Sequence, residues 1–333
     1  MGDLGKVRLG LIGAGGIAQV SHIPNILGEP EVELAAICDS DVGRLTSVAK
    51  RYGISQWFDE PEQMFQKANL SAVIISTPTI SHLPLCQIAF ENQVDVFLEK
   101  PIARNLSEAL KIVEFAESNQ RLLMLGMNHR FREDTKHLKR ALAEGLLGDL
   151  LAVRSGWLKR LGVWGRPYWF TDPKIAGGGV LLDLGLQMID LTLYLLDFPA
   201  AIEVNCGISS EVLGLKVEDT AAVFIRFETG VTFTLEVSWA ECNDQDIAYT
   251  HFAGSHGGAS LNPLRLTRRV GDRVVVGGVP TFGDEVDLYR RSFRVEISHF
   301  IESVKTRRQP LSSGRDALPA LEIVSKLYRA AGI

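Results

Sequence analysis

The sequence contains few cysteines: four in 333 residues, with no C-x-x-C pair among them. Scattered cysteines lack both the spacing of a zinc site and the density of a disulfide-stapled secreted domain. Cys38, Cys86, Cys206 and Cys242 are therefore expected to be buried, reduced thiols, and no metal site is expected. Reduced thiols favour the cytoplasm as the compartment.

Long apolar runs and an excess of basic charge are also lacking. No segment approaches the ~18 uncharged apolar residues of a membrane span, and the first residues lack the basic start and apolar core of a secretion signal. We therefore expect no membrane partner. The formal net charge of -5 argues against a nucleic-acid partner, which usually requires a basic surface.

The chain does carry an alternation of short apolar runs and helical patterns in its first third, which predicts a parallel sheet with helical crossovers. The expected strands are 7–13, 32–39, 71–77, 94–100 and 121–127. The expected helices are 16–27, 42–53, 81–92 and 106–119. Ser107 is the expected N-terminal cap of the last helix, with Glu108 in its first turn.

The pattern changes after about residue 150. Residues 221–240 alternate apolar and polar side chains around the turn "ETG", which predicts two antiparallel strands, and residues 293–306 and 317–331 read as helices. The fold class is therefore α/β, with two domains. We expect a Rossmann dinucleotide-binding domain at 1–127 and, at 128–333, an α+β domain with a largely antiparallel open sheet.

A glycine turn follows the first strand. Gly13-Ala14-Gly15-Gly16-Ile17-Ala18 reads G-x-G-x-x-A between a strand and a helix, as a dinucleotide fingerprint requires. Gly13 makes the tight turn, and Gly15 lets a pyrophosphate approach the free N–H groups of the helix start. Gly16 and Ile17 belong to the same expected contact surface.

Asp39 ends the second strand, where an acid binds the ribose hydroxyls of the adenosine. Its carboxylate would repel a 2′-phosphate, which favours NAD over NADP. Arg44, five residues on, is able to pair with such a phosphate, so NADP stays open. Ser40 lies beside Asp39 and is expected to contact the same part of the cofactor.

Two further segments follow strands, and ligands of such sheets bind at the carboxyl ends of the strands. Thr77 is expected under the nicotinamide, and His82 either contacts the cofactor or is a polar residue of a first helical turn. Lys100, in "EKP", would be desolvated beside a cationic ring, which suits a lysine to proton transfer. Glu99 either opposes this effect or faces the ribose.

The stretch "GGGVLLDLGLQMIDL", residues 177–191, places two polar side chains on one helical face, Asp183 and Gln187. The three glycines before them are expected to let the backbone pass close to a cofactor or substrate. An amide cannot transfer a proton. Gln187 is therefore expected to position a substrate hydroxyl, and Asp183 to hold the substrate or assist Lys100.

The chain resembles the glucose–fructose oxidoreductase / inositol dehydrogenase / rhizopine catabolism (Gfo/Idh/MocA) family. The residues that carry the resemblance span most of the chain in the family's order: "GLIGAGGIA", "CDSD", "STPTISHLPLC", "FLEKPIA", "GMNHRF", "WFTDPKIAGGGVLLDLG" and "VEDTAAVFIRFETG". The resemblance implies an NAD(P)-dependent enzyme that oxidises alcohols of sugars, cyclitols or sugar derivatives. It also implies a homodimer or homotetramer formed through the C-terminal sheet.

By this resemblance, Lys100 matches the active-site lysine of the E-K-P motif, and Asp183 matches the aspartate after the glycine run. Many members have a histidine four residues later, where this chain has Gln187. Asn128, Arg166 and Tyr168 are expected to line the sugar pocket. Trp157, Trp164 and Trp169 are able to stack on a sugar face, although core packing is the default for a tryptophan.

Three functions fit these residues. The first is an oxidoreductase that moves a hydride between the nicotinamide and a secondary alcohol or ketone carbon. The second is a cofactor-binding sensor or regulator of the same fold without turnover, which the missing histidine favours and the intact Glu99-Lys100-Pro101 opposes. The third is an NAD-dependent glycosidase that cleaves by transient oxidation.

Overall fold

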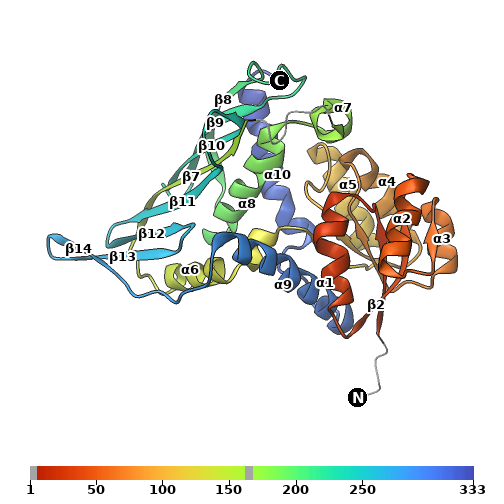
Figure 1. The fold of residues 1–333 in the computed structure, drawn as a ribbon. Coiled ribbons are helices and arrows are strands. Elements are labelled where there is room, and N and C mark those ends of the chain that lie inside the picture. Colours follow the sequence, from red (N-terminus) through yellow and green to blue (C-terminus); the bar gives the residue numbers. More distant parts are fainter. Residues whose placement is uncertain (1–5, 162–167) are drawn as a thin grey trace. The chain divides into compact units, whose positions relative to one another are not determined.

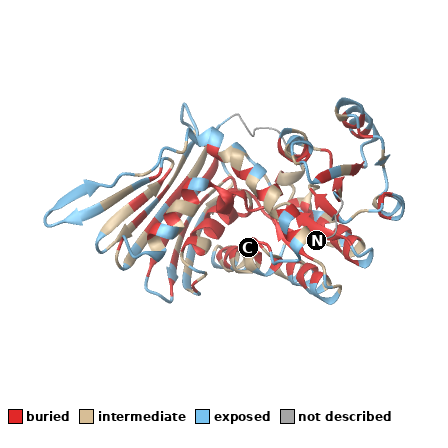
Figure 2. Cartoon of the chain, turned by 90° about the horizontal axis from the view of Figure 1, so that it is seen from below, coloured by how far each residue is buried: buried red, intermediate tan, exposed pale blue. Residues whose placement is uncertain are grey.

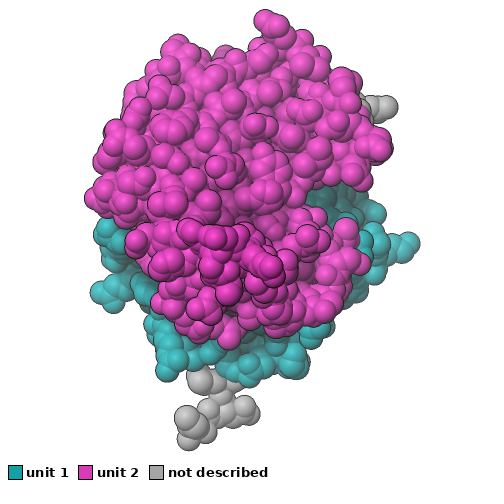
Figure 3. Space-filling view, turned by 90° about the vertical axis from the view of Figure 1, so that its left-hand side faces the viewer, with its two compact units in different colours: residues 1–128, 290–318 teal, residues 129–289, 319–333 magenta. Residues whose placement is uncertain are grey.

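The computed structural model describes residues 6–161 and 168–333. It divides into two compact units, residues 1–128 with 290–318 and residues 129–289 with 319–333, which Figure 3 colours separately. The boundary expected at residue 127 lies beside the first change of unit. Residues 290–318, expected in the second domain, belong to the first unit.

The first unit contains a six-stranded sheet of order β3-β2-β1-β4-β5-β6 in which all strands are parallel. The strands are β1 (Val7–Ile12), β2 (Val32–Cys38), β3 (Trp57–Phe58), β4 (Ala72–Ile75), β5 (Asp95–Leu98) and β6 (Leu123–Leu125). β4 and β5 are buried at every position, as expected of strands covered on both faces. The strand order reverses between β1 and β4, which is where ligands of such sheets bind.

Helices follow the strands as the sequence predicts. They are η1 (Ala18–His22), α1 (Ile23–Leu27), α2 (Val42–Tyr52), α3 (Pro61–Lys67), η2 (Thr79–Ser81), α4 (His82–Glu91), α5 (Leu106–Ser118) and η3 (Asn128–Phe131). The prediction of Ser107 as the cap of α5 is wrong. Asn105 is the cap, because its side chain accepts a hydrogen bond from the N–H of Glu108 and Ser107 lies inside the first turn.

Residues 290–318 join the first unit through contacts far along the chain. Helix α9 (Glu285–Thr306) continues in this unit from residue 290, and its Phe300 packs edge-to-face on Phe97 of β5 at 5.6 Å between ring centroids. Ser312 donates to the carbonyl oxygen of Leu125 in β6 at 2.7 Å. Arg307 pairs with the buried carboxylate of Asp95. These contacts explain why the segment packs on the parallel sheet.

The second unit contains an eight-stranded sheet of order β14-β13-β12-β11-β7-β10-β9-β8. The strands are β7 (Leu150–Arg160), β8 (Ala201–Ser209), β9 (Thr220–Phe227), β10 (Thr232–Glu241), β11 (Ile247–Gly254), β12 (Gly257–Leu261), β13 (Arg265–Val270) and β14 (Arg273–Val276). All neighbours are antiparallel except β10 and β7, which are parallel. The expected largely antiparallel sheet is confirmed.

The predicted hairpin at 221–240 is present, with Phe233 opposite Ile225 and Leu235 opposite Val223. These four side chains are buried, so one face of the sheet forms the core of the second unit. Helix α8 (Leu186–Leu195) packs on this sheet (Figure 1). The hairpin β13–β14, at the edge of the sheet opposite β8, is largely exposed (Figure 2).

The remaining helices of the second unit are α6 (Glu133–Ala143), η4 (Trp169–Thr171), α7 (Pro173–Ala176) and η5 (Leu181–Gly185), together with most of α10 (Gly314–Ala330). Among the described residues, one helical stretch, Pro173–Leu195, has the length and composition of a membrane span. It includes Asp183 and Asp190, and 83% of its apolar window is buried in the protein. This stretch is therefore a core helix of the second unit.

The expectation of four buried thiols is correct for Cys38 and Cys86 only. Burial raises the pKa of Cys38 to about 12. Cys206 is half-buried in the edge strand β8, and Cys242, which follows β10, is exposed. In the described parts of the chain, no three His, Cys, Asp or Glu side chains form a group that could hold a metal ion.

Candidate functional site

The glycine turn after β1 has one glycine that the backbone requires. Gly13 has φ +91°, and a Cβ built on it would lie 2.5 Å from the carbonyl oxygen of Ser76. Its N–H donates to the carbonyl oxygen of Cys38 at 2.8 Å. The turn therefore lies against the ends of β2 and β4, and a larger residue at position 13 would push them apart.

Gly15 and Gly16 are different, because a Cβ built on either would meet no atom within 4 Å. The space in front of these two residues is open, and it lies at the beginning of the helical segment η1–α1, which starts at Ala18. An open space at a helix start, bordered by glycine N–H groups, fits a pyrophosphate. Ile17 is half-buried beside it.

Asp39 is buried at the end of β2 and holds the glycine turn. Its carboxylate accepts hydrogen bonds from the N–H groups of Ala14 at 2.7 Å and Asp41 at 2.8 Å. Arg44 pairs with Asp39 at 3.1 Å and with Asp41 at 3.0 Å. Both acids thus compete with any phosphate for this arginine. Ser40, between them, is exposed.

His82 lies beneath the ends of β4 and β5 and is 1% exposed. Its Nε2 is 3.0 Å from the carbonyl oxygen of Thr77, and its Nδ1 is 3.0 Å from that of Pro101. Burial, partly opposed by these contacts, lowers the pKa of His82. The ring therefore links the loop after β4 to the loop after β5, which carries Lys100.

Glu99 and Lys100 follow β5 directly. Nε2 of the fully buried His22 lies 2.8 Å from one oxygen of Glu99, and the other oxygen accepts from the N–H of Lys100 at 3.2 Å. Burial would raise the pKa of Glu99, but His22 and Lys100 together outweigh burial and lower the pKa. The sequence did not indicate this pairing of Glu99 with a histidine in the helix after the glycine turn.

In the second unit, the glycine run at 177–179 has protein neighbours. Gly177 ends α7 in the left-handed region, with φ 94°. A Cβ on Gly178 would lie 2.1 Å from the hydroxyl of Tyr328, and one on Gly179 would lie 2.2 Å from the carbonyl oxygen of Glu218. The last two glycines thus admit Tyr328 and Glu218, a role that the sequence did not suggest.

The helix after the glycines begins with a π-helical turn, η5, which contains Asp183 and continues as α8. Such turns often occur at functional sites. Asp183 is half-buried, and its Oδ2 accepts a hydrogen bond from Nε1 of Trp239 in β10 at 3.1 Å. Gln187 is 6% exposed, and its Nε2 donates to the carbonyl oxygen of Asp183 at 3.1 Å.

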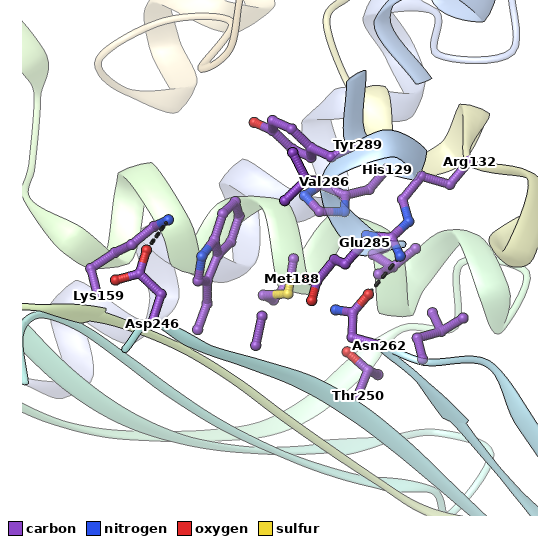
Figure 4. Close-up of a pocket in the computed structure, with 14 residues that line it drawn as sticks. His129, Arg132, Lys159, Met188, Asp246, Thr250, Asn262, Glu285, Val286 and Tyr289 are labelled. Carbon is purple, nitrogen blue, oxygen red and sulfur yellow. Dashed lines mark hydrogen bonds and ion pairs between the residues drawn. The ribbon is translucent and has the colours of Figure 1, made fainter. Parts of the chain in front are cut away.

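A cavity of about 310 Å³ lies within the second unit. Its walls come from η3, β7, β11, β12, α8 and the first turn of α9 (Figure 4). The aromatic side chains that line it are His129, Trp157 and Tyr289, with His129 edge-on to Trp157 at 5.4 Å. Trp157 therefore has the surroundings of a binding residue, as the sequence allowed.

The charged side chains that line this cavity are two basic and two acidic residues, Arg132, Lys159, Asp246 and Glu285. Lys159 pairs with Asp246 at 2.9 Å (Figure 4). Burial would raise the pKa of Asp246, but the N–H of Arg160 and the charge of Lys159 outweigh it and lower the pKa. Burial also raises the pKa of Glu285, which Arg132 partly opposes.

The structure places the residues expected to bind substrate in different surroundings. Asn128 is buried and donates to Ser292 at 3.0 Å within the first unit. Tyr168 is 60% exposed before η4. Arg166 and Trp164 lie outside the described residues, and Trp169 packs edge-on against Phe170.

Sequence reasoning missed most of the cavity. The segment "GMNHRF" did indicate this region, because Asn128 was expected to bind substrate. The residue of that segment that lines the cavity is His129, the neighbour of Asn128. Lys159 stands two residues after Trp157, and alternate residues of a strand share one face. No local signal pointed to Asp246 or Glu285, because they reach the cavity from segments distant in the sequence.

Two family models match the chain. Residues 7–127 match the oxidoreductase family with an NAD-binding Rossmann fold, GFO_IDH_MocA. Residues 135–260 match the GFO/IDH/MocA C-terminal domain.

Proteins of known activity are similar over nearly the whole chain. The D-glucoside 3-dehydrogenase of Escherichia coli (strain K12) is 31% identical, covering 98% of this chain and 95% of its own. The myo-inositol 2-dehydrogenase of Thermotoga maritima is 26% identical, covering 95% and 93%. A levoglucosan dehydrogenase solved with NADH and levoglucosan shares the fold, with a TM-score of 0.87 at 20% identity, covering 98% of this chain and 97% of that one.

Proposed function

The chain belongs to the Gfo/Idh/MocA oxidoreductase family, and on this premise we propose that it transfers a hydride between NAD and a secondary alcohol carbon of a neutral sugar, glycoside or cyclitol. It is an NAD(P)-dependent dehydrogenase that acts on CH–OH groups. The observation that carries the finer proposal is the cavity of the second unit. Its walls are aromatic and its two basic side chains are already paired, Lys159 with Asp246 and Arg132 with Asp134, which suits an uncharged polyol.

Bound NAD would accept the hydride from the substrate, and the residues of the chain would hold the cofactor and move one proton. The pyrophosphate would lie in the open space at Gly15 and Gly16, and the adenosine ribose would bind Asp39. Thr77, in the loop that His82 holds, would contact the nicotinamide end. These roles are supported by the glycine geometry and by the match to the NAD-binding model.

Lys100 would take the proton of the substrate hydroxyl as its carbon is oxidised. Asp183 would hold that hydroxyl or assist Lys100, and its carboxylate is oriented by Trp239. Gln187 uses its Nε2 on the backbone, so its Oε1 is the atom that would accept from a substrate hydroxyl. In this proposal the amide of Gln187 binds a substrate hydroxyl, and Lys100 is the general base.

We expect the Asp39→Ala variant to bind NAD about 10- to 100-fold more weakly, since a hydrogen bond to a charged group is worth ~1.5–3 kcal/mol. The gap between the NAD and NADP affinities should narrow, because the carboxylate that repels a 2′-phosphate is removed and Arg44 loses one of its two acidic partners, keeping only Asp41. Titration of both cofactors, followed by tryptophan fluorescence, measures the effect.

The matched control for this prediction is Glu114→Ala, which removes an exposed acid of α5 in the same unit. Its NAD and NADP affinities should equal those of the wild type. Far better turnover of NADP than of NAD by the wild type would contradict the assignment of Asp39.

The preference for a neutral substrate rests on the charges in the cavity. Lys159 is already neutralised by Asp246, and Arg132 bonds Asn262 at 2.5 Å and Asp134 at 2.7 Å. A carboxylate or phosphate on the substrate would have to displace an existing partner, whereas hydroxyls can bond to these groups without breaking the pairs. A methyl glucoside or an inositol should therefore be preferred over the matching glucuronide or sugar phosphate.

The Asp246→Asn variant tests this preference. Lys159 then keeps its charge without its partner, and kcat/KM for a methyl glucuronide should rise about tenfold while that for the methyl glucoside changes little. The asparagine oxygen can still accept from the N–H of Arg160, which bonds Asp246 at 2.8 Å. The measurement is initial rates of NADH formation over the substrate panel.

Asp244→Asn is the matched control, since Asp244 is exposed and does not line the cavity. A wild type that prefers the glucuronide, or an Asp246→Asn variant with an unchanged preference, would refute the role of the pair. Mass spectrometry of the product distinguishes an oxidised glycoside from a cleaved one, and thus the dehydrogenase from the NAD-dependent glycosidase.

Two parts of the expectation from the sequence stay predictions. One is a homodimer or homotetramer through the C-terminal sheet, which is supported by exposed apolar residues on its hairpin β13–β14, such as Val274 and Val276. The other is the cytoplasmic compartment.

A further inference from the structure

Glu218 is a buried carboxylate two residues before the start of β9, and it is 5% exposed. One of its oxygens accepts from the N–H groups of Gly179 and Leu181, both at 3.0 Å. Its own carbonyl oxygen accepts from the N–H of Val180 at 2.9 Å. Three successive N–H groups at the start of the helix that carries Asp183 therefore donate hydrogen bonds to this one residue. These are donors that a helix cannot satisfy internally.

A carboxylate is a costly choice for this position. Burial raises the pKa of Glu218, and the hydrogen bond from Tyr328 and the N–H groups of Leu181 and Gly179 only partly oppose this. A serine or asparagine would cap a helix without burying a charge. The charge makes the hydrogen bonds shorter and stronger, which holds the first turn in one arrangement.

The chain makes room for this arrangement at two glycines, Gly178 and Gly179. A Cβ on Gly179 would lie 2.8 Å from the Glu218 carboxylate, in addition to its clash with the carbonyl oxygen. A Cβ on Gly178 would collide with Tyr328, whose hydroxyl donates to Glu218 at 2.8 Å from helix α10. The two glycines thus leave space for the Glu218 carboxylate and for Tyr328, and Tyr328 holds that carboxylate with a hydrogen bond.

The hydrogen bonds lead from Glu218 to Asp183 in two ways. Through the helix, the N–H of Asp183 donates to the carbonyl oxygen of Gly179 at 3.0 Å. Through the sheet, the N–H of Trp239 donates to the carbonyl oxygen of Asp219 at 2.9 Å, and its indole donates to Asp183 at 3.1 Å. The backbone and the carboxylate of Asp183 are therefore both located relative to the residues at the start of β9.

We propose that Glu218 is a positioning residue for Asp183: its carboxylate, held by Tyr328, sets the first turn of the helix so that Asp183 meets the indole of Trp239. The catalytic importance of Asp183 rests on the proposed function. The hydrogen bonds that connect Glu218 to Asp183 do not depend on it.

The test that needs no activity is the indole N–H resonance of Trp239 in a ¹H–¹⁵N spectrum, assigned with Trp239→Phe. In Glu218→Gln the amide oxygen is uncharged and accepts more weakly from Gly179, Leu181 and Tyr328. The NH₂ group takes the place of the second oxygen, which accepts from the N–H of Gly179 at 3.1 Å. The helix start should therefore move, and the Trp239 resonance should shift toward its position in Asp183→Asn. Glu228→Gln is the matched control. Glu228 is an exposed glutamate at the other end of β9 that also accepts a backbone N–H, from Ala200 at 3.0 Å.

Steady-state kinetics distinguish a positioning role of Glu218 from a general loss of protein stability. Glu218→Gln should lower kcat about tenfold or more with KM for NAD unchanged, and it should have no further effect in an Asp183→Asn background, since residues that act as a unit are not additive. An equal loss in both backgrounds, or an unmoved Trp239 resonance in folded Glu218→Gln, would overturn the proposal.

If Glu218→Gln does not fold, Tyr328→Phe decides, because it removes only the hydroxyl that holds the carboxylate. It should shift the same resonance in the same direction by a smaller amount, and no shift would overturn the proposal. If the wild type oxidises no sugar or cyclitol, the proposed function fails, and the spectra still decide the positioning role.

Discussion

The Lys100→Met variant is expected to lose about 100-fold or more in kcat, the scale of a general acid–base contribution, while its NAD affinity stays within a few-fold of the wild type. Methionine keeps the length of the side chain but cannot carry a proton. Lys100 stands at the carboxyl end of β5, and its backbone is held by Glu99 through a 3.2 Å hydrogen bond that the substitution leaves intact. Steady-state rates and calorimetric titration of NAD measure the two quantities.

Lys111→Met is the matched control, because Lys111 is an exposed lysine of α5 in the same unit. It should leave both kcat and NAD affinity unchanged. A near-normal kcat in Lys100→Met would refute the role of Lys100 as the proton acceptor, whatever the substrate proves to be.

The Arg130→Met variant is expected to lower the free energy of unfolding by about 3–5 kcal/mol, because it leaves a buried carboxylate without its partner. Arg130 and Asp190 have side chains that are 1% and 2% exposed, and Nε of Arg130 donates to Asp190 at 2.8 Å. The guanidinium also lies over the rings of Tyr194 and Phe198. Urea denaturation followed by circular dichroism measures the loss.

The control is Arg226→Met, which breaks an exposed ion pair with Glu203 in the same unit and should cost less than about 1 kcal/mol. A loss in Arg130→Met no larger than in Arg226→Met would mean that the buried pair contributes no more than a surface one. The double variant Arg130→Met with Asp190→Leu should recover part of the stability, since it leaves no buried charge.

The cofactor half of the protein was accessible from the sequence because its signals are local. A glycine turn, the strand before it and the helix after it lie within about 20 consecutive residues. The all-buried strand β4 appears as an unbroken apolar run for the same reason. Asp39 was identifiable because it ends a strand, although its bond to the N–H of Ala14 and its pairing with Arg44 were not.

The sequence by itself thus determined the α/β architecture and the positions of Gly13, Asp39, Lys100 and Asp183 at the ends or starts of their elements. Periodicity and turn residues act over a few neighbours, and so they can be read without knowing the fold.

Only the tertiary structure decided what surrounds those residues. It showed that residues 290–318 return to the first unit, that Glu99 pairs with His22, and that the cavity is lined by Trp157, Asp246 and Glu285. It also changed the meaning of the glycine run, whose missing side chains admit Glu218 and Tyr328. Such contacts join residues tens to more than a hundred positions apart, and nothing in the local sequence of either partner records the other.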